Sequence, residues 1–84
     1  MWEVIVSRTA AKSIKKVPKK DHDKIIEVLK QMQFEPRDGD LQAIRTRPGV
    51  IRRRVGVWRI FFTISDRERR VEVLDVVRRT SKTY

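Results

Sequence analysis

The chain has 84 residues, with 21 lysines and arginines against 11 acidic residues and a formal net charge of +10. This length predicts one small domain over residues 1–84 that buries about 60–65% of the surface its unfolded form exposes, so we expect a partner or an oligomer to add stability. The lack of cysteine excludes disulfides and thiolate metal sites and is consistent with the cytoplasm, and no apolar run approaches the ~18 residues of a membrane span. The charge favours a polyanionic partner, because neutralising phosphates releases counterions; the alternative is a basic surface without a specific ligand.

The first third of the chain predicts a strand followed by a helix. Residues 2–7 alternate weakly and are rich in β-branched side chains, as strands are. Ser7 or Thr9 can cap a helix, in which apolar residues recur on one face as far as Val17. We expect this helix to end there, because Pro18 cannot continue a helix interior.

A second amphipathic helix is predicted after the proline. Asp21 suits its N-cap, and residues 35–40, which contain Pro and Gly, end it as a loop. Residues 41–47 are ambiguous, since Leu41 and Ile44 could pack but no clear period is present. The apolar stripe of the second helix consists of Ile25, Val28, Leu29 and Met32.

Residues 50–64 predict two strands joined at Gly56. Successive strand residues point to opposite faces, so one face gathers side chains for a core. These are Trp58, Ile60, Phe62 and Ile64 on the second strand. The other face of this hairpin would gather Arg52, Arg54 and Arg59, which suggests a sheet used as a cationic platform. On the first strand, alternation places Ile51, Arg53 and Val55 opposite Arg52 and Arg54.

Residues 71–77 predict a last, central strand that is covered at least in part on both sides. The expected fold is α+β: an N-terminal strand, a two-helix hairpin, then a three-stranded antiparallel meander. The helices would pack on one face of a four-stranded sheet. The hairpin arginines would then lie on its free face.

The segment Arg-x-Arg-Val-Gly-x-Trp-Arg-Ile-Phe-Phe at residues 52–62 resembles the hairpin of the RelE/ParE toxin superfamily, whose typical form is Arg-x-Arg-x-Gly-x-Tyr-Arg. The order of the other elements and the terminal Arg-Arg and tyrosine are similar to the family as well. The resemblance implies the toxin of a type II toxin–antitoxin pair acting in a prokaryotic cytoplasm. RelE-like members cleave messenger RNA, usually on the ribosome, by attack of a ribose 2′-hydroxyl on the adjacent phosphate, without a metal or cofactor. ParE-like members inhibit DNA gyrase instead.

The resemblance also implies candidate catalytic residues. Arg59 matches an arginine that contacts the scissile phosphate, and Arg79 matches a phosphate-stabilising arginine after the last strand. Arg78 replaces Arg79 as a candidate if the register slips by one residue. Tyr84 matches a terminal tyrosine that could stack on a base or exchange a proton.

Arg52 and Arg54 match a basic pair that holds the RNA backbone, and guanidinium groups suit phosphate. Arginine stays protonated near neutral pH and is a poor general base, so the base is not identified. Asp75 is a possible carboxylate, although an ion pair with an arginine is the more usual role. His22, the single histidine, lies at a helix start and is expected to be a surface residue.

Three functional hypotheses therefore remain. The first is a ribonuclease toxin, the second is a gyrase inhibitor on the same scaffold, and the third is a non-catalytic, RNA-binding member of the superfamily. The expected partners are messenger RNA and the ribosome, with a cognate antitoxin covering the basic sheet face, and no membrane or metal. The lysine-rich first helix could steer the protein onto ribosomal RNA or be a solvated helix face.

Overall fold

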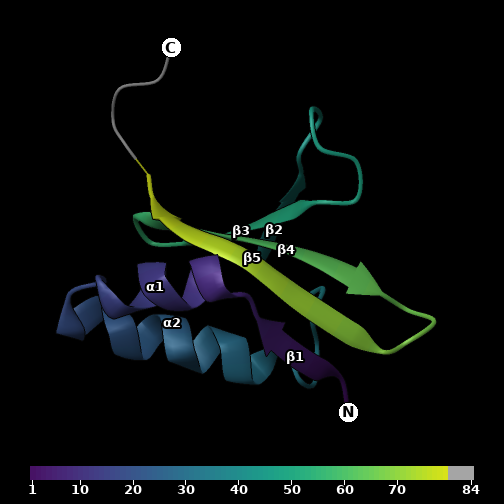
Figure 1. The fold of residues 1–84 in the computed structure, drawn as a ribbon, viewed down its shortest axis with the longest axis horizontal. Helices are drawn as coiled ribbons and strands as arrows, with labels where there is room; N and C mark the ends of the chain where they lie inside the picture. Colours follow the sequence, from purple (N-terminus) through teal and green to yellow (C-terminus); the bar gives the residue numbers. More distant parts are fainter. Residues whose placement is uncertain (80–84) are drawn as a thin grey trace.

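The computed structural model, which describes residues 1–79, consists of two helices packed on a mixed sheet (Figure 1). In chain order the elements are β1 (Glu3–Val6), α1 (Arg8–Lys15), α2 (Lys19–Gln31), β2 (Asp40–Ala43), β3 (Ile51–Val55), β4 (Trp58–Ser65) and β5 (Arg70–Arg78). The strand order is β1-β5-β4-β3-β2, with β1 parallel to β5 and the other neighbours antiparallel. In residues 1–79, neither helix has the length and hydropathy needed to cross a membrane.

The predicted α+β architecture is confirmed, but the sheet has five strands rather than four. The additional strand is β2, in the segment whose sequence was ambiguous, and it pairs with β3 at the edge of the sheet. Leu41 packs against the core while Gln42 and Ala43 are exposed, so β2 buries too little apolar surface to show a clear period. β5 is an interior strand, as predicted. Its second face is covered in part, since Leu74, Asp75 and Val77 are half-buried while Glu72 is exposed.

The start of the first helix was predicted correctly and the start of the second was not. Ser7 is the N-cap of α1, and its Oγ accepts a hydrogen bond from the Ala10 N–H at 3.1 Å. α2 begins two residues before Asp21, after Pro18, which caps it without a side-chain hydrogen bond. The Asp21 carboxylate instead accepts a hydrogen bond from Trp58 Nε1 at 3.0 Å, which joins the helix layer to the sheet.

The core lies between the helices and one face of the sheet. On β4, every second side chain from Trp58 to Phe62 is buried, as the alternation predicted. The side chains with no measurable exposure include Ala10, Ile25, Met32, Ile60, Phe62, Val71 and Val73. Both helices therefore bury their apolar stripes against the centre of the sheet, and Figure 1 shows them together below it.

One arginine is part of this buried layer. Arg53 faces the helices opposite Ile60, with a side chain that is 8% exposed, and its Nη2 donates to Gln31 Oε1 at 3.4 Å. Its Nη1 is buried without a hydrogen-bond partner in the described residues. The guanidinium packs against Gly39, where an added Cβ would stand 2.7 Å from both Cζ and Nε of Arg53.

The contact between Gly39 and Arg53 predicts a specific loss of stability. Gly39 has φ of 97°, so Gly39→Ala incurs a backbone cost of about 1–2 kcal/mol. It should also incur a steric cost of about 1–3 kcal/mol, because the buried guanidinium must move. Chemical denaturation followed by circular dichroism measures the total loss in the free energy of unfolding.

Gly49→Ala is the matched control for this prediction. Gly49 also has positive φ, 82°, but an added Cβ there meets nothing within 4 Å. We expect Gly49→Ala to lower the free energy of unfolding only by the backbone cost, without the steric cost. Equal losses in the two variants would contradict a structural role for the packing of Gly39 on Arg53.

Candidate functional site

The sheet face away from the helices carries a cluster of arginines. Across β3 and β4, Arg54 lies directly opposite Arg59, and Arg52 lies directly opposite Phe61. Directly paired residues share a face, so these four side chains form two adjacent rows, which we call the arginine face. The predicted division of the three consecutive arginines is therefore confirmed: two lie on this face and Arg53 lies under the sheet.

The positive charge of the arginine face is not neutralised within residues 1–79. Asp40 on β2 lies opposite Arg54 in the register, yet none of the three arginines has a carboxylate oxygen within 4.0 Å. Arg52 Nη2 donates to the neutral Gln42 Oε1 at 2.7 Å, and its Nε is buried without a partner. Two guanidinium groups placed opposite each other repel, so this arrangement lowers stability. A surface that retains such a pair suits an anionic ligand.

The two arginines at the end of β5 lie in different environments. Arg78 is paired with Trp58, and its Cζ lies 5.9 Å from the centre of the indole ring, on the side of the helices. Arg79 is exposed and follows the last residue of β5; its backbone N–H donates to the Val57 carbonyl, and Val77, two residues earlier, lies opposite Arg59. Arg78 therefore lies on the helix side, whereas the placement of Arg79 on the arginine face stays a prediction. Tyr84 lies outside the described residues.

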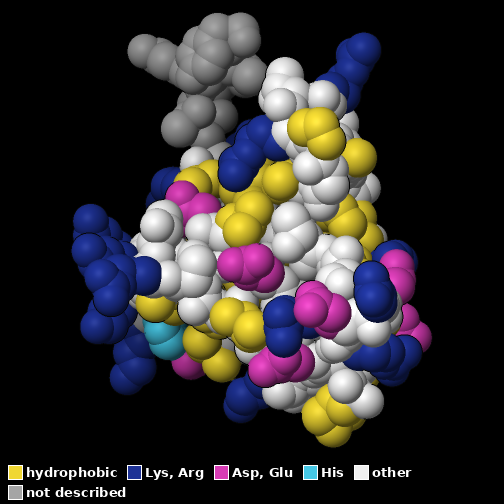
Figure 2. All heavy atoms as spheres, turned by 45° about the vertical axis from the view of Figure 1, so that its right-hand side comes forward, with side chains coloured by type: hydrophobic (Ala, Val, Ile, Leu, Met, Phe, Trp, Pro, Cys, Tyr) yellow, Lys and Arg dark blue, Asp and Glu magenta, His cyan; other side chains and the backbone are white. Residues whose placement is uncertain are grey.

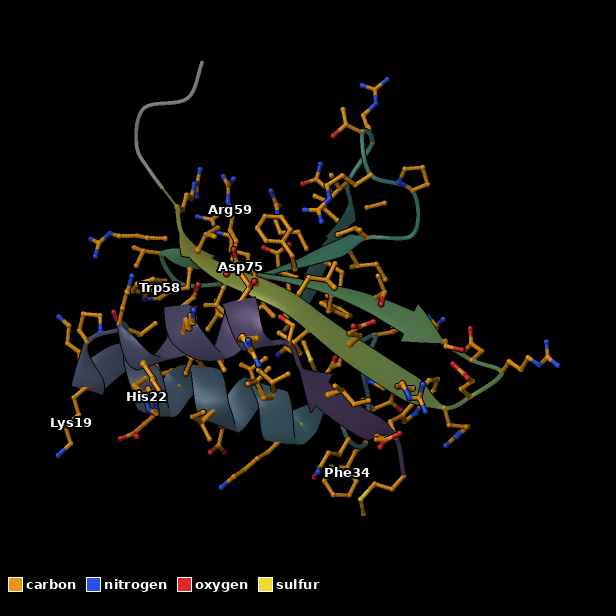
Figure 3. All side chains as sticks on the ribbon, in the orientation of Figure 1. Lys19, His22, Phe34, Trp58, Arg59 and Asp75 are labelled. Atoms are coloured by element: carbon orange, nitrogen blue, oxygen red, sulfur yellow. The ribbon has the colours of Figure 1, made fainter. Side chains whose placement is uncertain are left out.

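Asp75 has a structural environment that differs from the expected ion pair. Its Oδ1 accepts hydrogen bonds from Ser13 Oγ at 2.6 Å and from the Val76 N–H at 2.8 Å, and none of the described arginines pairs with it. A register shift between Phe61 and Phe62 turns the strand at this point. Figure 3 shows Asp75 next to α1, whereas Arg59 projects away from the helices. Asp75 thus connects β5 to α1.

His22 is far from the arginine face, as predicted. It lies on α2, where its Nδ1 is 4.0 Å from Asp23 Oδ1. Figure 3 shows it on the helix side of the molecule, and Arg59 on the opposite side.

One residue of the site was missed by the sequence analysis, and the burial of Arg53 on the other face was not foreseen. Gln42 belongs to a strand that was not predicted, and it fixes one nitrogen of Arg52. Arg53 was placed on the core face by alternation, but nothing in the sequence indicated that a charged group would be buried there. The apolar Leu41 beside the polar Gln42 was the available signal for β2.

Ion pairs at the other end of the sheet connect loops to strands. Arg37, after α2, forms a two-point hydrogen-bonded pair with Asp66 in the β4–β5 turn, at 3.0 and 2.8 Å. The hydrogen bond from Arg37 lowers the pKa of Asp66 and raises that of Arg37. Similarly, the hydrogen bond to Glu3 raises the pKa of Arg70, with Glu68 adding to the effect. These arginines have carboxylate partners, in contrast to those of the arginine face.

Comparison with known proteins agrees with this structure. The family model of the ParE toxin of type II toxin–antitoxin systems matches residues 4–82. The toxin–antitoxin complex RelBE2 from Mycobacterium tuberculosis is similar, with 25% identity, a TM-score of 0.81, and coverage of 93% of this chain and 98% of that one. The archaeal RelE–RelB complex from Pyrococcus horikoshii has 16% identity and a TM-score of 0.82, covering 96% and 98%. The isolated RelE toxin of Escherichia coli has 15% identity and a TM-score of 0.80, covering 98% and 88%. No curated protein matches.

The chain belongs to the RelE/ParE toxin superfamily, as its hairpin predicted. Within that superfamily it is a toxin of the type II toxin–antitoxin class.

The opposition of Arg54 and Arg59 predicts that removing one charge stabilises the fold. Arg54→Gln should raise the free energy of unfolding by about 0.2–1 kcal/mol at low salt, because a like-charge pair is removed. The gain should shrink between about 20 mM and about 500 mM NaCl, since salt screens exposed charges. Denaturation at several salt concentrations tests this, with Arg45→Gln in the exposed β2–β3 loop as the control. A gain that does not depend on salt would show that repulsion is not its cause.

The pair between Arg37 and Asp66 predicts a pH dependence of stability. Because the pKa of Asp66 is lowered in the folded protein, its contribution is present above the unfolded pKa and disappears as the pH falls through the folded value. The stability difference between wild type and Asp66→Asn should therefore be largest near neutral pH and vanish in acid. Asp38→Asn, in the same region but without an ion pair in the described residues, should show no such trend. A difference that is constant with pH would contradict the assignment.

Proposed function

We propose that this toxin is an endoribonuclease that cleaves messenger RNA on the ribosome, with the arginine face holding the phosphates around the cut. The observation that carries the proposal is the opposed pair Arg54 and Arg59, which has no carboxylate partner within the described residues. Guanidinium groups bind phosphate through two parallel hydrogen bonds. Phe61, half-buried beside them, offers a ring on which a base can stack.

The proposed reaction is attack of a ribose 2′-hydroxyl on the adjacent phosphate. Arg59 would contact the scissile phosphate and, with Arg79, would stabilise the charge that develops on its oxygens. Arg52 and Arg54 would hold the neighbouring backbone, with Arg52 oriented by Gln42. Positive charge is thus supplied by arginines in a reaction that requires no metal.

Proton transfer is the step that these arginines do not explain. A guanidinium remains protonated near neutral pH and does not act as a base. We therefore assign removal of the 2′-hydroxyl proton to a group outside the arginine face, on the ribosome or in bound water, and expect cleavage of free RNA to be slow. Tyr84 is a candidate for giving a proton to the leaving 5′-oxygen or for stacking.

The proposed regulatory partner is a cognate antitoxin in a prokaryotic cytoplasm. The similar chains from Mycobacterium tuberculosis and Pyrococcus horikoshii are described in complexes with antitoxins. An acidic antitoxin segment laid over the arginine face would neutralise the repelling guanidinium groups and block RNA at the same time.

Inhibition of DNA gyrase is the second candidate function. It is favoured by the family model, which is that of the ParE toxins. It is also favoured by Arg78, which packs on Trp58 rather than joining the phosphate-binding cluster. A gyrase inhibitor needs a protein-binding surface and not a set of converging phosphate contacts.

Induction of the toxin in cells, followed by mapping of messenger RNA 5′ ends after a few minutes, tests the proposal. We expect new ends inside coding regions with the wild type, and their loss in the double variant Arg59→Ala/Arg79→Ala, because both phosphate contacts are removed. Arg47→Ala/Arg67→Ala removes the same charge from exposed loops and should still cut.

Growth arrest with intact messages and relaxed plasmid DNA would support gyrase as the target and overturn the ribonuclease. Cuts that persist in the double variant would show that the arginine face is not the active site. A soluble wild-type protein that neither cuts messages nor arrests growth would leave a non-catalytic RNA-binding member.

A further inference from the structure

Two neighbouring arginines of β3 each bury a nitrogen without a hydrogen-bond partner, and both lie opposite β2. Within residues 1–79, the buried side-chain nitrogen and oxygen atoms that lack a partner are Nε of Arg52 and Nη1 of Arg53. Arg52 is paired with Gln42, and Arg53 is paired with Leu41. Successive strand residues point to opposite faces, so one such nitrogen lies on each face of the same strand pair. A buried donor of a charged group without a partner destabilises the arrangement that buries it.

β2 makes few contacts that offset this cost. It lies at the edge of the sheet (Figure 1), is four residues long and exposes three of them. Of these residues only Leu41, which is half-buried, packs against the core. On the other face Gln42 accepts one hydrogen bond from Arg52 at 2.7 Å. Asp40 lies opposite Arg54 but forms no ion pair within 4.0 Å in the described residues. Release of β2 therefore exposes little apolar surface.

Fixed points on either side of β2 bound the segment that can move. Before it, Arg37 forms its two-point pair with Asp66 in the β4–β5 turn. Figure 2 turns this end of the sheet forward and shows acidic and basic side chains next to each other there. After β2, the Ile44 N–H donates to the carbonyl of the buried Val50 at 3.0 Å. Residues 38–43, which we call the latch, lie between these points.

Opening of the latch changes both faces of the sheet at once. On the helix side Gly39 covers Arg53, since an added Cβ there would stand 2.7 Å from both Cζ and Nε of the guanidinium group. The bond from Arg53 to Gln31 on α2 is long, 3.4 Å, so the latch is the closer cover. Its departure admits water, which supplies the missing partner. On the arginine face the same movement takes the Gln42 oxygen away from Arg52.

We propose that the latch leaves the sheet as a unit while β3, β4 and β5 stay paired, and that its closure positions Arg52 on the arginine face. Leu41 is the positioning residue, because it faces the core and holds the adjacent Gln42 in place through the backbone. The closed latch restricts the rotamers of Arg52, and the open latch leaves them free. Closure and RNA binding then favour each other to the same extent. The effect on RNA rests on the proposed function, whereas the opening itself does not.

Native-state hydrogen exchange followed by NMR measures the opening without any ligand. Hydrogen-bonded pairs alternate along antiparallel strands, so counting from the bonded Ile44 places the N–H groups of Gln42 and Arg52 between β2 and β3. The N–H of Ile60, opposite Arg53, lies between β3 and β4. We expect Gln42 and Arg52 to share one protection factor, about 100-fold below that of Ile60. Equal protection of all three groups would overturn the proposal, because β2 would then leave only with the whole sheet.

Removal of the buried charge tests the cause of the opening. Arg53→Met keeps a long side chain without the charge, so the protection of Gln42 and Arg52 should rise about tenfold or more, together with that of Ile60. A rise at Ile60 alone would contradict the proposal, because the guanidinium would then stay buried when β2 leaves. The control Arg47→Met, in an exposed loop, should change all three by less than about twofold.

An unpaired RNA of about five nucleotides is the probe for the positioning role. Leu41→Ala should lower the protection of the latch and weaken binding by about threefold to tenfold, because the competent state is less populated. Leu41→Met should bind as the wild type does. Ala43→Cys/Ile51→Cys joins two directly opposite residues, whose spacing suits a disulfide, in a chain without other cysteines. Added to Leu41→Ala, this lock should restore binding when oxidised and lose it again when reduced.

Lower protection of the latch with unchanged RNA affinity, or an oxidised lock that does not restore binding, would overturn the positioning of Arg52. The NMR order parameter of the Arg52 Nε–H group measures the same positioning without RNA and should fall in Leu41→Ala. A wild type whose latch opens and orders Arg52 as expected, but which binds no RNA, would contradict the proposed function alone. Circular dichroism verifies the folding of each variant.

Discussion

Burial of one face of the sheet is the constraint on which the rest of this structure depends. In a domain of 84 residues, two helices supply enough apolar surface to cover one side of five strands, through side chains such as Ile25, Ile60 and Phe62. Because strand residues alternate, each buried side chain on β3 and β4 places the next residue of its strand on the opposite face of the sheet. The core thus determines which arginines reach solvent together, and a shift of register by one residue would exchange Arg53 with its two neighbours.

Two polar contacts connect the helix layer to the sheet at its functional end. Trp58 donates to Asp21 on α2, and Ser13 on α1 donates to Asp75 on β5. Both contacts use carboxylates that the sequence suggested for other roles, a helix cap and an arginine partner. Asp75 is bound to α1 and Arg78 packs on Trp58, and Arg59 has no carboxylate oxygen within 4.0 Å in the described residues. The carboxylates nearest to the arginine face in the register, Asp40 opposite Arg54 and Asp75 opposite Phe61, thus form no ion pair with its arginines in the described residues.

The arginine face determines the chemistry that the exposed side of the sheet offers. The arginine face combines planar guanidinium groups with Phe61, which suits oriented contacts to an unpaired strand. Because one scaffold serves both RelE-like and ParE-like toxins, the fold does not decide the target.

The sequence by itself determined the alternating hairpin of β3 and β4, the two amphipathic helices and the division of Arg52, Arg53 and Arg54 between two faces, because these follow from the local periods of strands and helices. It narrowed the cap of α1 to Ser7 or Thr9, and the structure has Ser7 there. Tertiary structure alone decided the edge strand β2, the parallel pairing of β1 with β5, and the partners of Asp21 and Asp75. A short edge strand has little apolar surface, and a side-chain partner 37 or 62 residues away leaves no periodic mark in the sequence. Local order was thus readable from the chain, whereas the partners of its charged groups required the assembled fold.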